Sequence, residues 1–239
     1  MPGQKLRNPD CRLRAPRRRA AALAVLCLAL AGVTIGPAPA ADPATALAQY
    51  VRALESSYRG VETLRAEFTQ THTWGGRSRV EAGTVYFARG GAMRWDYREP
   101  KPKLFLASGK HLILYVPEER QLTRSAVKSS EDVRVPFRLL LSRLSLRKVF
   151  SRIEFADAAL AAQPGNRILR AFPKGGQDEA YTEVLLEVTP TFDIRRLVVF
   201  YPDRSRMEFT FDHIERNVAL SPTLFRFTAP PGTEVIDQK

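Results

Sequence analysis

The feature that most constrains the fold is a long succession of short segments in which apolar and polar residues alternate. In 206–214, for example, Met207, Phe209 and Phe211 alternate with charged or polar residues. Successive side chains of a strand point to opposite faces, so a period of two predicts strands with one buried face. Short turn signals such as the Gly-Gly pair at 75–76 separate these segments and favour antiparallel pairing. The expected strands are 64–69, 80–88, 92–97, 103–107, 111–116, 121–126, 167–173, 181–189, 194–201, 206–214 and 225–228.

Two segments interrupt this pattern with helical spacing. Leu47, Val51, Leu54 and Tyr58 recur at steps of four, three and four residues and predict an opening helix. Residues 136–144 begin with proline, which suits a first helical turn, and carry apolar residues at helical spacing. We therefore expect a mainly β (α+β) fold of one domain. Its antiparallel sheet or open barrel would have helices against one face.

Several expected strands are apolar on both faces, for example 104–106, 112–116 and 197–201. An antiparallel sheet with one wet face would alternate cleanly. Either helices or a second sheet cover the second face, or an apolar cavity lies between the sheet and the helices. Composition alone favours the first explanation, because buried cores are far commoner than lipid pockets.

The first forty residues have the layout of a secretory signal. Seven basic residues precede an apolar stretch at 20–35, and Ala38-Pro39-Ala40 provides a cleavage site. The apolar stretch is shorter than the roughly 20 residues that a membrane span requires, which argues against an anchor. Arg17-Arg18 leaves twin-arginine export open beside the general route. We expect a signal peptide at 1–40, cleaved near Ala40, and one exported domain at 41–239.

Removal of this signal changes the charge balance. Seven of the 37 basic residues and one of the 25 acidic residues lie in it, so the formal net charge falls from +12 to +6. The remaining positive charge is spread along the chain, which indicates solubility or attraction to acidic surfaces and not nucleic-acid binding. Cys11 and Cys27 leave with the signal, so the exported chain has to rely on its core without disulfides.

No catalytic constellation is visible in the exported part. It has no G-x-S-x-G motif and no glycine-rich phosphate loop, and His72, His111 and His213 stand alone, without metal-ligand spacing. Asp212 precedes His213, but neighbours on a strand point to opposite faces, so the two cannot act together. We expect no enzyme activity, no metal site and no cofactor.

Six stretches carry a family resemblance through their order and spacing. They are RAEFTQ (65–70), GTVYFAR (83–89), MRWDY (93–97), LYVPEERQ (114–121), PFRLL (136–140) and LSPTLFRFTAPPG (220–232). Together they resemble the outer-membrane lipoprotein carrier family, the LolA-type periplasmic chaperones, over almost the whole exported chain.

The resemblance implies an open antiparallel β half-barrel with helices forming a lid over an apolar concave face. It also implies a periplasmic, monomeric carrier that shields the acyl chains of lipoproteins. Such a carrier collects acylated lipoproteins from an inner-membrane ABC transporter and passes them to an outer-membrane receptor. A carrier of another lipid or glycolipid, and an envelope lipid-sensing protein of the same fold, are the alternatives.

The resemblance further assigns roles to single residues. Arg89 matches the arginine that latches the lid, with backbone acceptors expected near Leu140 and Leu141, although Gly90-Gly91 stands where members often have Arg-Pro. Met93 resembles an apolar surface position that faces the transporter or receptor. Ordinary core packing is the competing explanation for each expected wall residue of the acyl-chain cavity. These wall residues are Phe68, Phe87, Trp95, Leu106, Leu114 and Phe137.

Overall fold

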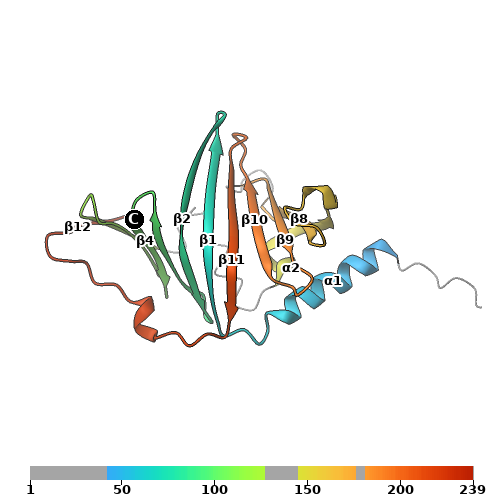
Figure 1. Ribbon diagram of the computed structural model, residues 1–239, viewed down its shortest axis with the longest axis horizontal. Coiled ribbons are helices and arrows are strands. Elements are labelled where there is room, and N and C mark those ends of the chain that lie inside the picture. Colours follow the sequence, from blue (N-terminus) through green and yellow to red (C-terminus); the bar gives the residue numbers. More distant parts are fainter. Residues whose placement is uncertain (1–41, 127–144, 176–180, 239) are drawn as a thin grey trace, which may run out of the picture. The chain divides into compact units, whose positions relative to one another are not determined.

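The computed structural model describes residues 42–126, 145–175 and 181–238. In these ranges the chain forms one twelve-stranded sheet with a few short helical segments (Figure 1). None of the helices in these ranges is both long and apolar enough to cross a bilayer. The helical elements are α1 (Pro43–Ser57), α2 (Leu146–Val149) and the 3-10 turns η3 (Ala158–Leu160) and η5 (Pro222–Phe225). The strands are β1 (Thr63–Trp74), β2 (Arg77–Ala88), β3 (Ala92–Glu99), β4 (Lys103–Ser108), β5 (His111–Val116), β6 (Gln121–Ala126), β7 (Phe150–Phe155), β8 (Arg167–Pro173), β9 (Glu183–Val188), β10 (Ile194–Phe200), β11 (Arg206–Arg216) and β12 (Glu234–Asp237).

The sheet has the strand order β12-β6-β5-β4-β3-β2-β1-β11-β10-β9-β8-β7. β1 pairs antiparallel with β2 on one side and with β11 on the other, so it joins two meanders. β12 is the exception to antiparallel pairing and lies parallel to β6 at one edge. Because the order ends at β12 and β7, the sheet of the described residues is open, as the sequence predicted.

Most expected strands are confirmed, and those at 111–116, 121–126 and 167–173 have the predicted bounds. The strand expected at 225–228 is wrong. Residues 222–225 form the turn η5, which the Ser221 Oγ begins by accepting a hydrogen bond from the Thr223 N at 3.3 Å. Phe225 of this turn is buried, and the turn packs on β3 and β4. β7 and β12 were not expected, and the helix expected at 136–144 lies outside the described residues.

Helix α1 begins where its sequence favours a start. The Asp42 carboxylate accepts a hydrogen bond from the Thr45 N at 3.3 Å, and proline occupies the first turn. Val51, Leu54 and Tyr58 of its apolar stripe are buried in the main core cluster on one face of the sheet. We call this face, which carries Trp95, the inner face, and the opposite one the outer face.

The outer face is also apolar in places, and segments of the same chain cover it there. Leu104 and Leu106 of β4 are buried outside the inner cluster, where η5 packs on β3 and β4. Ile168, Leu185 and Val198 of β8, β9 and β10 form a second small cluster, against which residues from the η3 segment pack. The second apolar face of these strands is therefore covered by turns and extended chain.

A close backbone approach occurs at Gly83, where the register between β2 and β3 shifts. A Cβ atom at this position would lie 2.0 Å from the main-chain oxygen of Asp96. We expect Gly83→Ala to lower the free energy of unfolding by about 3 kcal/mol, because β3 has to move. Urea denaturation measures this.

Gly60→Ala is the matched control, since no atom lies within 4 Å of a Cβ there. Its free energy of unfolding should change by less than about 1 kcal/mol. Equal losses in the two variants would contradict the role of the close approach.

Candidate functional site

Trp95 lies at the centre of an aromatic cluster on the inner face. Its ring packs edge-on against Phe68 and Phe87, with 4.8 and 5.8 Å between ring centroids. It is tilted against Phe209 and Phe211, at 5.3 and 6.1 Å. Trp95 itself is fully buried (0% exposed). Because edge-to-face pairs are favourable beyond the area they bury, this cluster stabilises the junction of the two meanders around β1.

Phe68, Phe87 and Trp95 were predicted as cavity walls, and the structure brings them together in the inner cluster. Leu114 is half-buried and packs against the same cluster. Contact of these residues with acyl chains stays a prediction. Phe137 lies outside the described residues.

The prediction for Leu106 is wrong. Leu106 is paired with Arg94, whereas its neighbour Phe105 is paired with Trp95. Directly paired residues point to the same face, so Leu106 shares the outer face with Arg94. Arg94 donates a hydrogen bond to the main-chain oxygen of Leu224 at 3.0 Å, which holds the C-terminal segment over this face.

The expectation that Met93 is exposed is also wrong. Met93 precedes Trp95 by two residues on β3, so its side chain points to the same inner face. It is fully buried (0% exposed) and belongs to the inner cluster. The alternation that buries Trp95 therefore buries Met93 as well.

At one end of the inner face, buried polar groups replace the apolar surface. The Tyr97 hydroxyl donates to Gln70 Oε1 at 2.5 Å, and Gln70 Nε2 donates to Glu81 Oε2 at 3.4 Å. Arg79 and Lys103 contact the Glu81 carboxylate at 2.8 and 2.7 Å. A buried carboxylate requires such partners, so this chain of contacts limits the apolar face. The sequence analysis missed it, because its members come from four strands.

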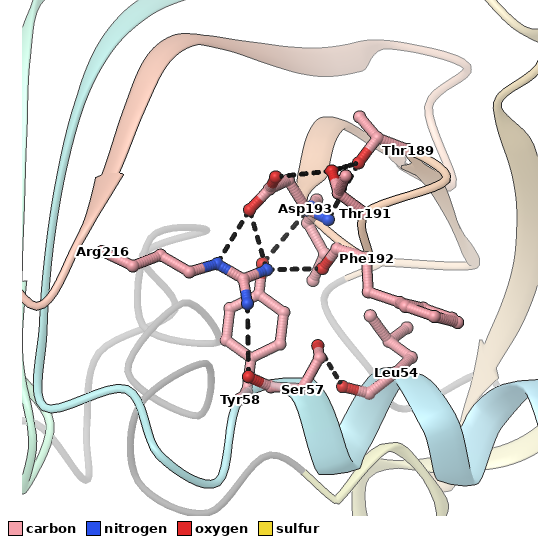
Figure 2. Close-up of polar contacts among 9 residues, drawn as sticks. Leu54, Ser57, Tyr58, Thr189, Thr191, Phe192, Asp193 and Arg216 are labelled. Carbon is pink, nitrogen blue, oxygen red and sulfur yellow. Dashed lines mark hydrogen bonds and ion pairs between the residues drawn. The ribbon is translucent and has the colours of Figure 1, made fainter.

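Arg216, at the end of β11, holds the C-terminal end of α1 (Figure 2). It donates hydrogen bonds to the main-chain oxygens of Ser57 at 3.2 Å and Phe192 at 2.7 Å. Its Nε and Nη2 lie 2.8 and 2.7 Å from Asp193 Oδ1, and the guanidinium lies over the Tyr58 ring, 4.6 Å from its centroid. One side chain thus connects α1, the β9–β10 turn and β11.

The groups around Arg216 are themselves held in place. The Tyr58 hydroxyl accepts a hydrogen bond from the Ile194 N at 3.0 Å, and burial raises the pKa of Tyr58, which therefore stays neutral. Thr191 Oγ1 donates to Asp193 Oδ2 at 3.0 Å (Figure 2). A cation at the C-terminal end of a helix is also favoured by the helix dipole.

Arg89 follows β2 and binds the connection between α1 and β1. Its Nη2 donates to the main-chain oxygens of Arg59 at 2.6 Å and Val61 at 2.8 Å, and its Nε lies 2.7 Å from Glu62 Oε1. The predicted acceptors near Leu140 and Leu141 lie outside the described residues, so the lid latch stays a prediction. The contacts with the α1–β1 connection were not anticipated.

A pocket of about 310 Å³ lies between α1 and β7. This volume is at the lower end of the range for small-molecule sites. Two of its wall residues, Val51 and Phe150, belong to the inner cluster, so the pocket reaches the edge of that cluster. A second void, of about 10 Å³ beside Tyr58, has room for a single water at most. The full lining of the larger pocket is Leu47, Val51, Arg147, Phe150, Ser151, Ile153 and Lys174.

Glu81 and Glu187, the buried carboxylates of the described residues, both have structural partners. In the described ranges, no three His, Cys, Asp or Glu side chains are grouped so that they could hold a metal ion. Glu187 is 1% exposed and accepts hydrogen bonds from the Ala162 N at 3.0 Å, Asn166 at 2.7 Å and Arg196 at 3.1 Å. Burial alone would raise the pKa of Glu187, but these hydrogen bonds outweigh it and lower the pKa. This carboxylate anchors the η3 segment and is not placed to act as an acid or base.

We expect Arg216→Met to loosen α1 from the sheet. The change removes the charged partner of Asp193 and the donor to Ser57, so the free energy of unfolding should fall by about 2 kcal/mol. Hydrogen exchange of the α1 amides should become faster.

Arg65→Met is the matched control, because Arg65 pairs with Glu215, the neighbour of Arg216 on β11, but is 40% exposed. Exposed pairs contribute at most about 1 kcal/mol, so this variant should leave α1 exchange unchanged. Unchanged hydrogen exchange of the α1 amides in Arg216→Met would contradict the role of Arg216 in holding α1.

Comparison with known proteins agrees with this architecture. The family model "Outer membrane lipoprotein carrier protein LolA" matches residues 59–228. A relative from Dechloromonas aromatica, named outer-membrane lipoprotein carrier protein, is 30% identical over 202 residues, which cover 82% of this chain and 91% of the relative. A relative of the same name from Chromobacterium violaceum is 28% identical over 199 residues, 81% and 90% of the two chains. A solved structure, an uncharacterized conserved protein from Thermus thermophilus, shares the fold with a TM-score of 0.51 at 12% identity, over 80% of this chain and 99% of that one. The chain belongs to the outer membrane lipoprotein carrier protein LolA family.

Proposed function

We propose that this protein is a periplasmic carrier that shields the acyl chains of lipoproteins and moves them from the inner to the outer membrane. The observation that carries the proposal is the apolar inner face of an open sheet, centred on Trp95 and packed against α1. Each methylene withdrawn from water is worth about 0.8 kcal/mol, so exposing three fatty chains would cost tens of kcal/mol. Lipoproteins are the proposed cargo because the relatives are named as their carriers.

Uptake requires the inner face to be uncovered. Trp95 is fully buried, and the pocket beside α1 has a volume of only about 310 Å³. In our proposal α1 and the helix expected at 136–144 form a lid that moves when cargo enters. The hinge lies at the C-terminal end of α1, which Arg216 and Arg89 hold, and the movement occurs at the end near Leu47, which lines the pocket.

The proposed partners follow from the same carrier function. An inner-membrane ABC transporter opens the lid and loads the acylated lipoprotein, and an outer-membrane receptor accepts it. The carrier works as a monomer after cleavage of the signal peptide at 1–40, and it performs no chemistry on its cargo. Apolar contacts are non-directional, so a change in lid position alters affinity without the need to break specific bonds.

The face that binds cargo can be tested with two neighbouring residues of β5. Leu114 is paired with Phe105 and shares the inner face, whereas Ile113 is paired with Leu106 and shares the outer face. Both are half-buried. We expect Leu114→Glu to lower the yield of acylated protein that co-purifies with the carrier from periplasm at least about tenfold, because a charge among acyl chains is strongly unfavourable. Mass spectrometry of the co-purified molecules measures this.

Ile113→Glu is the control and should retain the cargo, with circular dichroism confirming that both variants fold. Equal loss in the two variants would contradict binding on the inner face. Free phospholipid in place of acylated protein would contradict lipoproteins as the cargo and point to a carrier of another lipid.

Arg89 tests the proposed lid movement. In Arg89→Leu we expect cargo to be taken up but released poorly, because the proposed latch from Arg89 to main-chain oxygens near Leu140 and Leu141, which stabilises the closed, empty state, is lost. Transfer of a labelled lipoprotein from the loaded carrier to receptor-containing vesicles should slow about tenfold. Arg59→Leu is the control, since it leaves the main-chain oxygen that Arg89 binds in place. Unchanged transfer in Arg89→Leu would remove this residue from the mechanism.

A further inference from the structure

Two hairpin tips lie side by side at one end of the sheet (Figure 1). The first joins β1 to β2 through Gly75-Gly76, and the second joins β10 to β11 at 201–205. They are neighbours because β1 pairs with β11, with Thr73 opposite Arg206. Tyr201 at the base of the second tip packs against the inner cluster, whereas Gly75, Gly76 and residues 202–205 do not belong to it.

Exposed apolar side chains occur on the first tip. Trp74 is 39% exposed and stacks on His72, with 4.6 Å between ring centroids, and Val80 is 55% exposed. A partly exposed tryptophan at the end of a long hairpin presents both an apolar ring and an N–H donor to its surroundings. Side chains of this kind are enriched where one end is apolar and the other is wet, as at a membrane surface.

The same end of the sheet carries positive charge. Arg77, directly opposite Trp74 in the β1–β2 pairing, is exposed, as are Arg204 and Arg206 of the second tip. None of these three arginines forms an ion pair within the described ranges, unlike Arg79, which contacts Glu81. The neighbouring carboxylate is Asp203. Hydrogen bonds from Ser205 lower the pKa of Asp203, so it stays ionised, and three arginines still outnumber it.

We propose that this end of the sheet, Trp74 with Arg77, Val80, Arg204 and Arg206, is a docking surface for an anionic phospholipid membrane. We call it the basic tip. The guanidinium groups match lipid phosphates in geometry and charge, and Trp74 inserts at the headgroup level. Contact is weak and reversible, because it rests on a few charges and one ring. The basic tip is independent of the proposed cargo site, so it would hold even if the cargo were different.

The chain contains its own reporter for this contact. It has two tryptophans, and Trp95 is fully buried whereas Trp74 is partly exposed. A change in tryptophan fluorescence on adding vesicles therefore reports on Trp74. We expect a blue shift and loss of acrylamide quenching with vesicles of phosphatidylglycerol and phosphatidylcholine in equal amounts. Neither change should occur with phosphatidylcholine alone, and high salt should reverse both. The signal should be absent in Trp74→Phe.

Co-sedimentation with the same vesicles then tests the charges. Arg77→Gln with Arg206→Gln should weaken binding at least about tenfold, since each basic side chain near an anionic surface contributes about fivefold. The control removes two exposed cations elsewhere, Arg52 on α1 and Lys110 in the β4–β5 turn, by the same change to Gln. This control should bind almost as well as the wild type.

Two results would overturn the proposal. One is a failure of the wild-type protein to bind the anionic vesicles at low salt. This result would overturn the proposal even if the basic tip bound an acidic protein. The other is equal weakening in the Arg77/Arg206 variant and the control, which would show a general charge effect. Both tests use the cargo-free protein, so a failure here leaves the proposed carrier function standing, and a failure of cargo binding leaves the basic tip standing.

Discussion

The pairing of β1 on both sides is the constraint on which the rest of the structure depends. β1 forms a twelve-residue ladder with β2 and a second long ladder with β11, so it joins segments that lie far apart in the chain. Phe68 on this strand is opposite Gly83 on one side and Phe211 on the other. The missing side chain at Gly83 lets the backbone of β3 come close, and the pairing of β1 brings the aromatic residues of both meanders into one cluster around Trp95. The apolar inner face exists because β1 unites two halves of a face that neither meander completes alone.

The strands on either side of β1 also determine how α1 is attached. Arg89 comes directly after β2 and Arg216 ends β11, so the α1–β1 connection lies between two arginines. Both donate to main-chain oxygens at or just after the end of the helix, where unpaired carbonyls need donors and the helix dipole favours cations. The helix that packs on the apolar face is thus held firmly at one end. An element held in this way can swing without being lost from the protein, which is what a reversible lid requires.

The two faces of the sheet differ in how they are covered. The inner face packs against a helix whose own apolar stripe fits it, through contacts that are mostly non-directional. The outer face is covered by irregular chain that polar contacts hold in place. On one half, Glu187 accepts from the Ala162 N and Arg196 donates to the Leu160 oxygen, and on the other, Arg94 donates to the Leu224 oxygen. Directional contacts with a buried charge are costly to break, whereas an apolar contact can be exchanged for another of similar size. This difference makes the inner face the one suited to exchange with a ligand.

The sequence by itself determined the class of fold and most strands, because the period of two and the glycine turns are local signals. The family resemblance assigned Trp95, Phe68 and Phe87 to one apolar cavity wall, and the structure brings these three residues together. The alternation of side chains along a strand could have assigned Met93 to the same face as Trp95, because the two are two residues apart. The family resemblance instead assigned Met93 to the protein surface. Leu106 could not be assigned this way, because its strand is apolar on both faces and only the pairing with Arg94 reveals the outward direction. Three further features could be found only in the tertiary structure. They are the polar chain from Tyr97 to Glu81, the contacts of Arg216 with α1, and the basic tip. The members of the polar chain come from four neighbouring strands, which the pairing of β1 to β4 brings together. Arg216 and Ser57 are separated by 159 residues, and the pairing of β1 with β11 brings together the two ends of the chain here and at the basic tip.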